Sequence, residues 1–138
     1  MAVMADVWTG RGKVRARETE GGGLEIVVDG ISTQARVYKP LIYEFFRKEW
    51  RAARPSWAEF AVEITMDYLG DPPWLDLDNL AKAILDACKG YAFHDDAQVA
   101  RLLVERTPGE RERICVTIRR LDGEGRTAPG FRASEVRS

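Results

Sequence analysis

Apolar residues recur every three or four positions through the middle of the chain, which is the spacing of one face of an α-helix. The residues on this face are Leu77, Leu80, Ala81, Ile84, Leu85 and Cys88. Asp76 just before them favours a helix N-cap, because its carboxylate can accept hydrogen bonds from free backbone N–H groups. Gly90 is typical of a helix end. The pattern predicts a helix that begins after Asp76, buries one face and ends near Gly90.

Four other segments alternate between apolar and polar positions and predict β-strands. They are residues 24–28, 60–68, 98–106 and 114–118. Asp29-Gly30 predicts a turn after the first of them. Pro108-Gly109 lies between the last two, so we expect these two strands to form a hairpin.

A second helical pattern follows Pro40, which suits the first turn of a helix. Its apolar face is Leu41, Ile42, Phe45, Phe46, Trp50 and Ala53, and Pro55 ends it. Another face carries Arg47, Arg51 and Arg54, with Lys48 beside it. Two interpretations remain open for these cations. They form a basic ridge that faces DNA, or they form a solvated surface that Glu44 and Glu49 partly neutralise.

The order strand, helix, strand, helix, hairpin predicts an α/β (α+β) fold, a small mixed β-sheet with two main helices packed on it. Residues 1–23 are charged, end in three glycines and predict a flexible N-terminal arm. Alternation of Lys13, Arg15 and Arg17 with apolar residues leaves an edge strand as the alternative. We expect residues 24–121 to form the folded domain and residues 122–138 a disordered tail.

The charge balance is unusual for a protein that binds nucleic acid, since the net charge is −1 and the pI is 5.9. The placement of the basic residues then matters more than their total. No apolar run approaches the ~20 residues of a membrane span, and the N-terminus lacks a signal-peptide pattern. We therefore expect a cytoplasmic protein without a membrane partner. Cys88 and Cys115 are expected to be buried free thiols, and no zinc-ligand spacing is present.

Acidic residues and one lysine gather at the start of the central helix. Asp76 and Asp78 lie on one turn, and Lys82 follows one turn later. Such carboxylates can hold Mg²⁺ for phosphodiester hydrolysis, while a fixed ammonium can stabilise charge in the transition state. The alternative is structural, with the carboxylates capping the helix and Lys82 bridging Asp78 and Asp86. Asp96 lies 18 residues past Asp78, and a returning connector could bring the two together.

The spacing Asp76-Leu-Asp78-Asn79-Leu80-x-Lys82, then Asp86, then Asp95-Asp96-Ala-Gln98-Val99 resembles the signature of RusA-type Holliday junction resolvases. These are small, homodimeric, magnesium-dependent endonucleases. The resemblance implies a RusA-like fold, catalytic and metal-binding roles for Asp76, Asp78 and Asp96, and a catalytic role for Lys82. It also implies Mg²⁺ as cofactor, with Mn²⁺ able to replace it, and branched (four-way) DNA as the substrate of a homodimer. We expect supporting roles for Asn79, Asp86 and Asp95.

Other residues near this motif leave alternatives open. Trp74 stacks on an unpaired base or forms an aromatic lid on the core. His94 could act as a general base. Gln98 either forms a hydrogen bond near the site or is only the polar first residue of a strand. Members of the resembled family often carry basic residues just ahead of the acidic motif, where this chain has Asp71-Pro72-Pro73-Trp74-Leu75. The remaining candidates for DNA binding are Arg36, Lys39, Arg47, Lys48, Arg51 and Arg54.

The first functional hypothesis is an endodeoxyribonuclease that resolves four-way junctions by paired phosphodiester hydrolysis in recombination and repair. The second is a DNA-structure-binding module with weak or no nuclease activity, motivated by the acidic pI and the missing basic residues. A third is a nuclease that acts on other branched or single-stranded DNA. Metal dependence separates the first two, because a pure binding module holds junctions equally well in EDTA.

Overall fold

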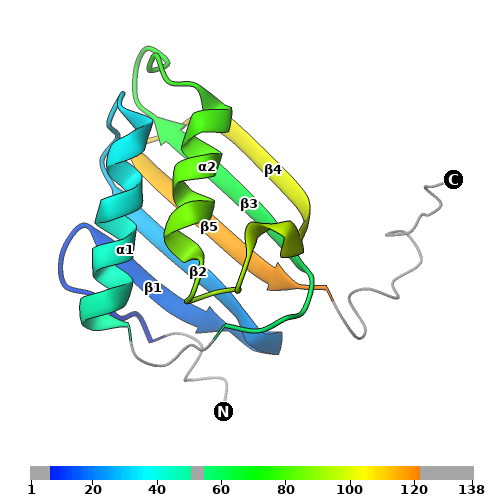
Figure 1. Ribbon diagram of the computed structural model, residues 1–138. Helices are drawn as coiled ribbons and strands as arrows, with labels where there is room; N and C mark the ends of the chain where they lie inside the picture. The colour runs from blue at the N-terminus through cyan, green and yellow to red at the C-terminus, as the bar shows by residue number, and fades with distance from the viewer. Residues whose placement is uncertain (1–6, 51–54, 122–138) are drawn as a thin grey trace, which may run out of the picture.

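Both helices lie on one face of a single five-stranded sheet in the computed structural model, which describes residues 7–50 and 55–121 (Figure 1). The helices are α1 (Tyr38–Glu49) and α2 (Leu77–Cys88). The strands are β1 (Val14–Thr19), β2 (Gly23–Asp29), β3 (Phe60–Tyr68), β4 (Val99–Pro108) and β5 (Arg113–Arg120). The expected α+β fold, a mixed sheet with two main helices, is confirmed.

The strand order is β1-β2-β5-β3-β4. All neighbours are antiparallel except β3 and β4, which run parallel and are connected through α2. The predicted hairpin of the last two strands is wrong, because β3 lies between them. Ile114, Val116 and Ile118 of β5 are buried, so this strand belongs in the middle of the sheet. Leu102 and Leu103 of β4 remain about half exposed (47% and 49%), which suits an edge strand.

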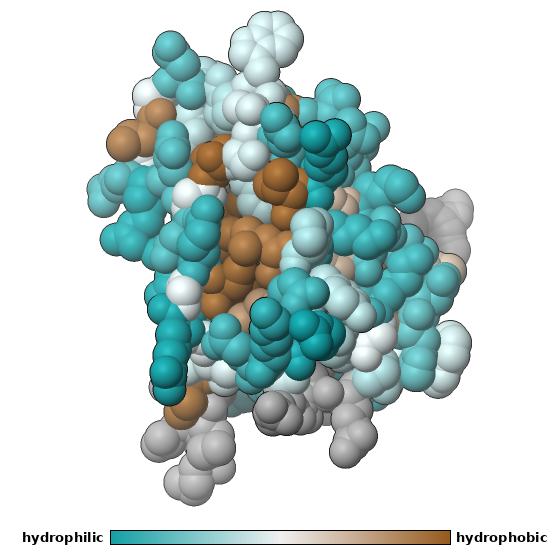
Figure 2. Space-filling view, turned by 60° about the vertical axis from the view of Figure 1, so that its left-hand side comes forward, coloured by the Kyte–Doolittle hydropathy of each residue, from teal (hydrophilic) through white to brown (hydrophobic). Residues whose placement is uncertain are grey.

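The core lies between the helices and the sheet. Its fully buried side chains include Ile42 and Phe46 from α1, Leu80 and Ile84 from α2, and Ile26, Ile64 and Met66 from the strands. These are the apolar positions of the helical and alternating patterns, so both periodicities of the sequence meet in one layer. Figure 2 shows a brown apolar hollow ringed by hydrophilic side chains on one side of the molecule.

The expectation of a flexible arm is wrong for Val14–Thr19, which form edge strand β1 along β2. Val14 and Ala16 are buried, and Arg15 binds Asp29 at 2.8 Å on the other face of the sheet. The glycines that suggested flexibility make the turn between the strands, where Gly21 and Gly22 have φ angles of 76° and 83°. Such positive φ angles are readily adopted by glycine. The predicted tail at 122–138 lies outside the described residues.

Helix α1 is shorter than its apolar pattern predicts. It ends at Glu49, and Trp50 is already extended, with φ −100° and ψ 113°. The indole of Trp50 folds back against Phe45 and Phe46, with ring centroids 6.3 Å away in each case. Arg51, Ala53 and Arg54, which the sequence placed on this helix, lie outside the described residues. No helix within the described ranges is long and apolar enough to cross a membrane.

The two cysteines are free, as the sequence predicts. Cys88 is buried at the end of α2, and burial raises the pKa of its thiol to about 12. Cys115 is only half-buried, which differs from the expected full burial, and burial raises the pKa of its thiol as well.

Candidate active site

The start of α2 presents two carboxylates that share one neighbour. Asp76 occupies the N-cap position, but its side chain caps no backbone N–H group. Its Oδ2 instead accepts a hydrogen bond from Nδ2 of Asn79 at 3.3 Å. The backbone N–H of Asn79 donates to Oδ1 of Asp78 at 3.0 Å. Asn79 therefore contacts both carboxylates, Asp76 through its side-chain amide and Asp78 through its backbone N–H. The capping role that was the alternative for Asp76 is not found.

Lys82 follows one turn later on the exposed side of α2. Among the described residues it makes no ion pair, so the structural alternative, in which Lys82 bridges Asp78 and Asp86, is not found. Lys82 lines two grooves, one on each side of α2. Its ammonium group is therefore available to an anion that approaches the helix from solvent.

The groove between α2 and edge strand β4 has a volume of about 450 Å³ and is lined by Asp78, Lys82 and Asp96. Leu102 and Val104 of β4 supply part of its apolar wall. Asp96 belongs to a short 3-10 helix (Asp96–Gln98) that follows the far end of α2, coloured yellow-green in Figure 1. In Figure 1 this short helix lies near the C-terminal end of α2, whereas Asp78 belongs to the first turn of α2.

This separation bears on the expected metal site. Within the described residues, no three His, Cys, Asp or Glu side chains form a group that could hold a metal ion. The predicted set Asp76, Asp78 and Asp96 is therefore not assembled there as a three-carboxylate cage. The Asp76–Asp78 pair still fits Mg²⁺, which takes one or two carboxylates and fills its other positions with water and substrate phosphate.

The connector that carries Asp96 is held by the side chain of Gln98. Its Oε1 accepts hydrogen bonds from the backbone N–H groups of His94 (2.8 Å) and Asp95 (3.0 Å). Its Nε2 donates to the carbonyls of Ser56 and Ala58, both at 2.7 Å. Asp95 caps the short helix by accepting from the N–H of Ala97 at 2.9 Å. Asp95 thus supports the connector, and Gln98 does more than begin a strand.

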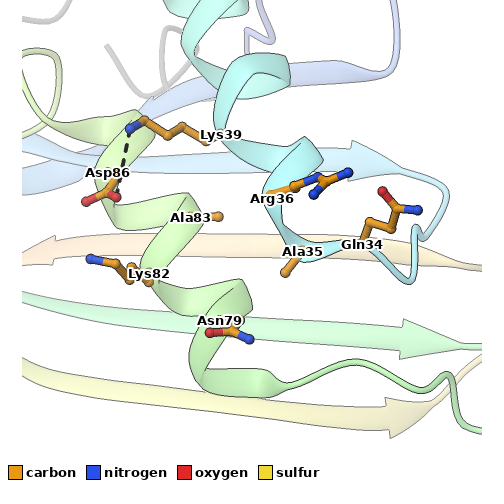
Figure 3. A pocket seen from close by; sticks show the side chains of 8 residues that line it. All are labelled: Gln34, Ala35, Arg36, Lys39, Asn79, Lys82, Ala83 and Asp86. Atoms are coloured by element: carbon orange, nitrogen blue, oxygen red, sulfur yellow. Dashed lines mark ion pairs between the residues drawn. The ribbon is translucent and has the colours of Figure 1, made fainter.

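On the other side of α2, a groove of about 550 Å³ separates it from α1 and the segment that precedes α1. Figure 3 shows the small side chains of Ala35 and Ala83 that line this groove, with polar side chains around them. The basic residues that line it are Arg36, Lys39 and Lys82. Neither Arg36 nor Lys82 is ion-paired within the described residues, so the rim is locally cationic although the whole chain is slightly acidic.

Asp86 pairs across this groove in a way that the sequence did not predict. Its carboxylate lies 4.0 Å from Nζ of Lys39 on α1 (Figure 3) and 3.7 Å from Nζ of Lys89. No contact joins it to Lys82 within the described residues, so the expected role of orienting that lysine has no support. Asp86 instead connects the two helices at the floor of the basic rim.

Within the described residues, the two cations of the expected basic ridge on α1, Arg47 and Lys48, share one carboxylate. Arg47 binds Glu44 with its Nη2 at 2.8 Å, and Lys48 lies 3.8 Å from the same carboxylate. The hydrogen bond from Arg47 lowers the pKa of Glu44 from its usual value. This favours the solvated-surface interpretation for Arg47 and Lys48, while Arg36 and Lys39 line a groove beside the acidic motif.

A model of the endodeoxyribonuclease RusA family matches residues 31–119, well over half of the chain. The chain belongs to this family. RusA proteins are endonucleases that resolve Holliday junctions, so this chain is a hydrolase of phosphodiester bonds by family. Nucleases of the RusA family generally depend on a divalent metal. A search of curated proteins found no match to the chain.

The RusA match covers the whole acidic motif and one cation that the sequence did not reveal. Arg106 of β4 donates to the carbonyl of Pro73 at 2.8 Å and lines a further groove with Asp76 and Asn79. Its position depends on the parallel pairing of β3 with β4, which places Arg106 opposite Met66. No local signal could have predicted this, because the pairing joins residues far apart in sequence.

Trp74 and His94 also differ from expectation. Trp74 is 92% exposed beside the acidic motif, so the lid on the core is wrong. The ring of His94 stacks on Trp57, with centroids 4.2 Å apart. No hydrogen bond from this ring to a carboxylate is found among the described residues, which leaves the general-base interpretation without a contact.

Proposed function

We propose that this protein is a magnesium-dependent, structure-specific endodeoxyribonuclease that resolves four-way DNA junctions in recombination and repair. The observation that carries the proposal is the arrangement on the exposed side of α2. Asp76, Asp78 and Asn79 lie at its start, Lys82 follows one turn later, and membership of the RusA family supplies the reaction class.

The two grooves that flank α2 suit two steps of the reaction, DNA binding and phosphodiester hydrolysis. Arg36 and Lys39 rim the groove toward α1, where a phosphate backbone would gain from these cations, of which Arg36 has no ion pair among the described residues. Lys82 and Asp78 line the groove toward β4. A strand that crosses α2 would therefore pass from the basic rim to the carboxylates, with the ammonium of Lys82 between them.

In this proposal Asp76 and Asp78 are the metal-binding carboxylates, held by Asn79 in a fixed pair. Mg²⁺, or Mn²⁺ in its place, supplies Lewis-acid activation of water and of the scissile phosphate when bound. Lys82 binds a phosphoryl oxygen and stabilises the charge that develops there. Asp96 acts from the connector that Gln98 and Asp95 fix.

We further propose that the protein acts as a homodimer. Resolution of a four-way junction needs two nicks on opposing strands, and each chain carries one motif. A twofold axis would place two copies of the motif on those strands.

A DNA-structure-binding module remains the second candidate. It is favoured because no three acidic side chains of the described residues gather into a group that could hold a metal ion, as an efficient metal nuclease would require. The retained Asp76–Asn79–Asp78 network and the unpaired Lys82 favour catalysis instead.

Asp78→Asn tests the catalytic assignment. The change keeps the size of the side chain but removes a negative oxygen ligand, so junction cleavage should be lost while junction binding is retained. Cleavage is followed on an end-labelled junction, and binding by gel shift in EDTA.

Glu18→Gln is the matched control, because it removes one charge from exposed edge strand β1 at the opposite side of the sheet. This variant should cleave like the wild type. Equal loss of binding and cleavage in a folded Asp78→Asn protein would contradict the assignment.

A further inference from the structure

Two side chains outside the acidic motif form an exposed aromatic pair. Trp57 lies in the segment before β3, and His94 lies in the connector after α2. Their rings stack with centroids 4.2 Å apart and planes inclined by only 10°. The stack covers one face of the indole, yet 72% of the surface of Trp57 remains accessible. An aromatic ring is thus supported from one side and open on the other.

Hydrogen bonds hold the two backbone segments that carry Trp57 and His94. Gln98 binds the carbonyls of Ser56 and Ala58, which flank Trp57, and the N–H of His94. The N–H of Ala58 also donates to Oγ of Ser56 at 3.1 Å. A parallel bridge between Ser56 and Phe93 also joins the two segments next to the stack. The backbone segments that carry both rings are therefore fixed next to each other, and the rings stack before any ligand binds, which lowers the entropic cost of binding.

The position of the pair suggests what binds there. His94 precedes Asp96 by two residues, on the connector that Gln98 fixes. Exposed, preorganised aromatic rings are the platforms on which unpaired bases stack in single-strand-binding proteins, because every base has a π-face. A duplex offers no such face along its length, whereas bases at the branch point of a junction can unstack.

We propose that the Trp57–His94 pair is a stacking site for one unpaired nucleobase of a branched DNA substrate. This inference rests on the proposed function and names the part of the DNA that the protein contacts. A base seated on the open face of Trp57 would bring its strand to the connector that carries Asp96. Stacking would thereby favour branch points over continuous duplex.

The test compares junction binding in EDTA at low salt, which keeps it independent of cleavage. One junction carries all its bases, and a second has abasic sugars at the nucleotides that flank the branch point. Trp57→Ala should weaken binding to the first junction about 5- to 150-fold, the range of base–aromatic stacking. It should have no such effect on the abasic junction. Trp57→Phe should restore most of the affinity, because it keeps an aromatic face.

Trp8→Ala is the matched control, since Trp8 is also a partly exposed indole but precedes β1, at the edge of the sheet opposite β4, and should leave binding to both junctions unchanged. His94→Ala should cost less affinity than Trp57→Ala, and His94→Phe should retain the stack. Equal weakening of both junctions by Trp57→Ala, or no weakening, would overturn the proposal. So would a wild type that binds neither junction.

Failure of the proposed function has a different outcome. Metal-dependent cleavage by the wild type, measured separately, would uphold the nuclease even if Trp57→Ala changed nothing. Tight base-dependent binding without any cleavage would uphold the stacking site and contradict the nuclease.

Discussion

Asn79 and Lys82 are the two residues on which the chemistry of α2 most depends after the carboxylates. Asn79 hydrogen-bonds both Asp76 and Asp78, and Lys82 stands one turn away without an ion pair among the described residues. A lysine that served only stability would be expected to pair with Asp78 or Asp86 on the same helix, a contact worth only ~0.2–0.5 kcal/mol. Its free ammonium instead suits a ligand from outside.

Lys82→Ala should lower kcat for junction cleavage about 10²-fold, the usual effect of removing one donor that stabilises a developing charge. Stability should change little, because Lys82 makes no ion pair or hydrogen bond among the described residues. Single-turnover cleavage and thermal unfolding measure the two effects.

Lys48→Ala is the comparison, since Lys48 is on α1 and already lies near Glu44. It should leave kcat unchanged. A Lys82→Ala protein that cleaves at the wild-type rate would refute the role of Lys82.

For single residues, the sequence predicted which side chains lie at the candidate site better than it predicted their ion-pair partners. Asp78 and Lys82 fall on one exposed side of α2, as their four-residue spacing implied, and Asp76 takes the N-cap position just before them, because helical spacing is a local property. The predicted partners of Asp86 were wrong, since its carboxylate lies near Lys39 of α1. The sequence of one helix does not determine which side chains of another helix pack against it.

The elements around the site are held by the apolar face of α2. Leu80 and Ile84 are fully buried, and this burial fixes which side of the helix carries Asp78 and Lys82. The helix and strand periodicities predicted this much directly. The strand order was not predictable in the same way, because β4 and β5 are adjacent in sequence but separated by β3 in space. Whether a strand is buried, like β5, or exposed at an edge, like β4, depends on the order of all five strands in the sheet.

Leu80→Ala should reduce the free energy of unfolding by about 2–5 kcal/mol, through lost burial and the cavity left behind. Leu103→Ala, on the exposed part of β4, should change it by less than about 0.5 kcal/mol. Urea denaturation followed by circular dichroism measures both. Similar losses in the two variants would mean that β4 is covered in solution.

Over the whole molecule, the low pI and DNA binding are reconciled by where the charges lie. Pairs such as Arg15–Asp29 and Arg17–Glu25 neutralise the far side of the sheet, while Arg36 at the α1–α2 groove remains without an ion pair among the described residues. Net charge therefore underestimates the attraction of this groove for phosphate. The sequence offered Arg36 only as one of several DNA-binding candidates, and the helix packing shows that it shares a groove with Lys82.

Arg36→Gln should weaken junction binding for all sequences alike and reduce the slope of log K against log salt by about 0.9, the value of one phosphate contact. Lys13→Gln, an exposed change just before β1, should leave the slope unaltered. Gel-shift titrations at several salt concentrations give both slopes. An unchanged slope for Arg36→Gln would remove this groove from the DNA path.

The central claim is tested most directly by cleavage of an end-labelled four-way junction beside a linear duplex of the same sequence, with Mg²⁺ and with EDTA at low salt. We predict paired, symmetric nicks in the junction alone, and only when Mg²⁺ is present. Tight junction binding without nicks under either condition would contradict the nuclease and leave a DNA-structure-binding module. Equal cutting of both substrates would contradict the junction specificity.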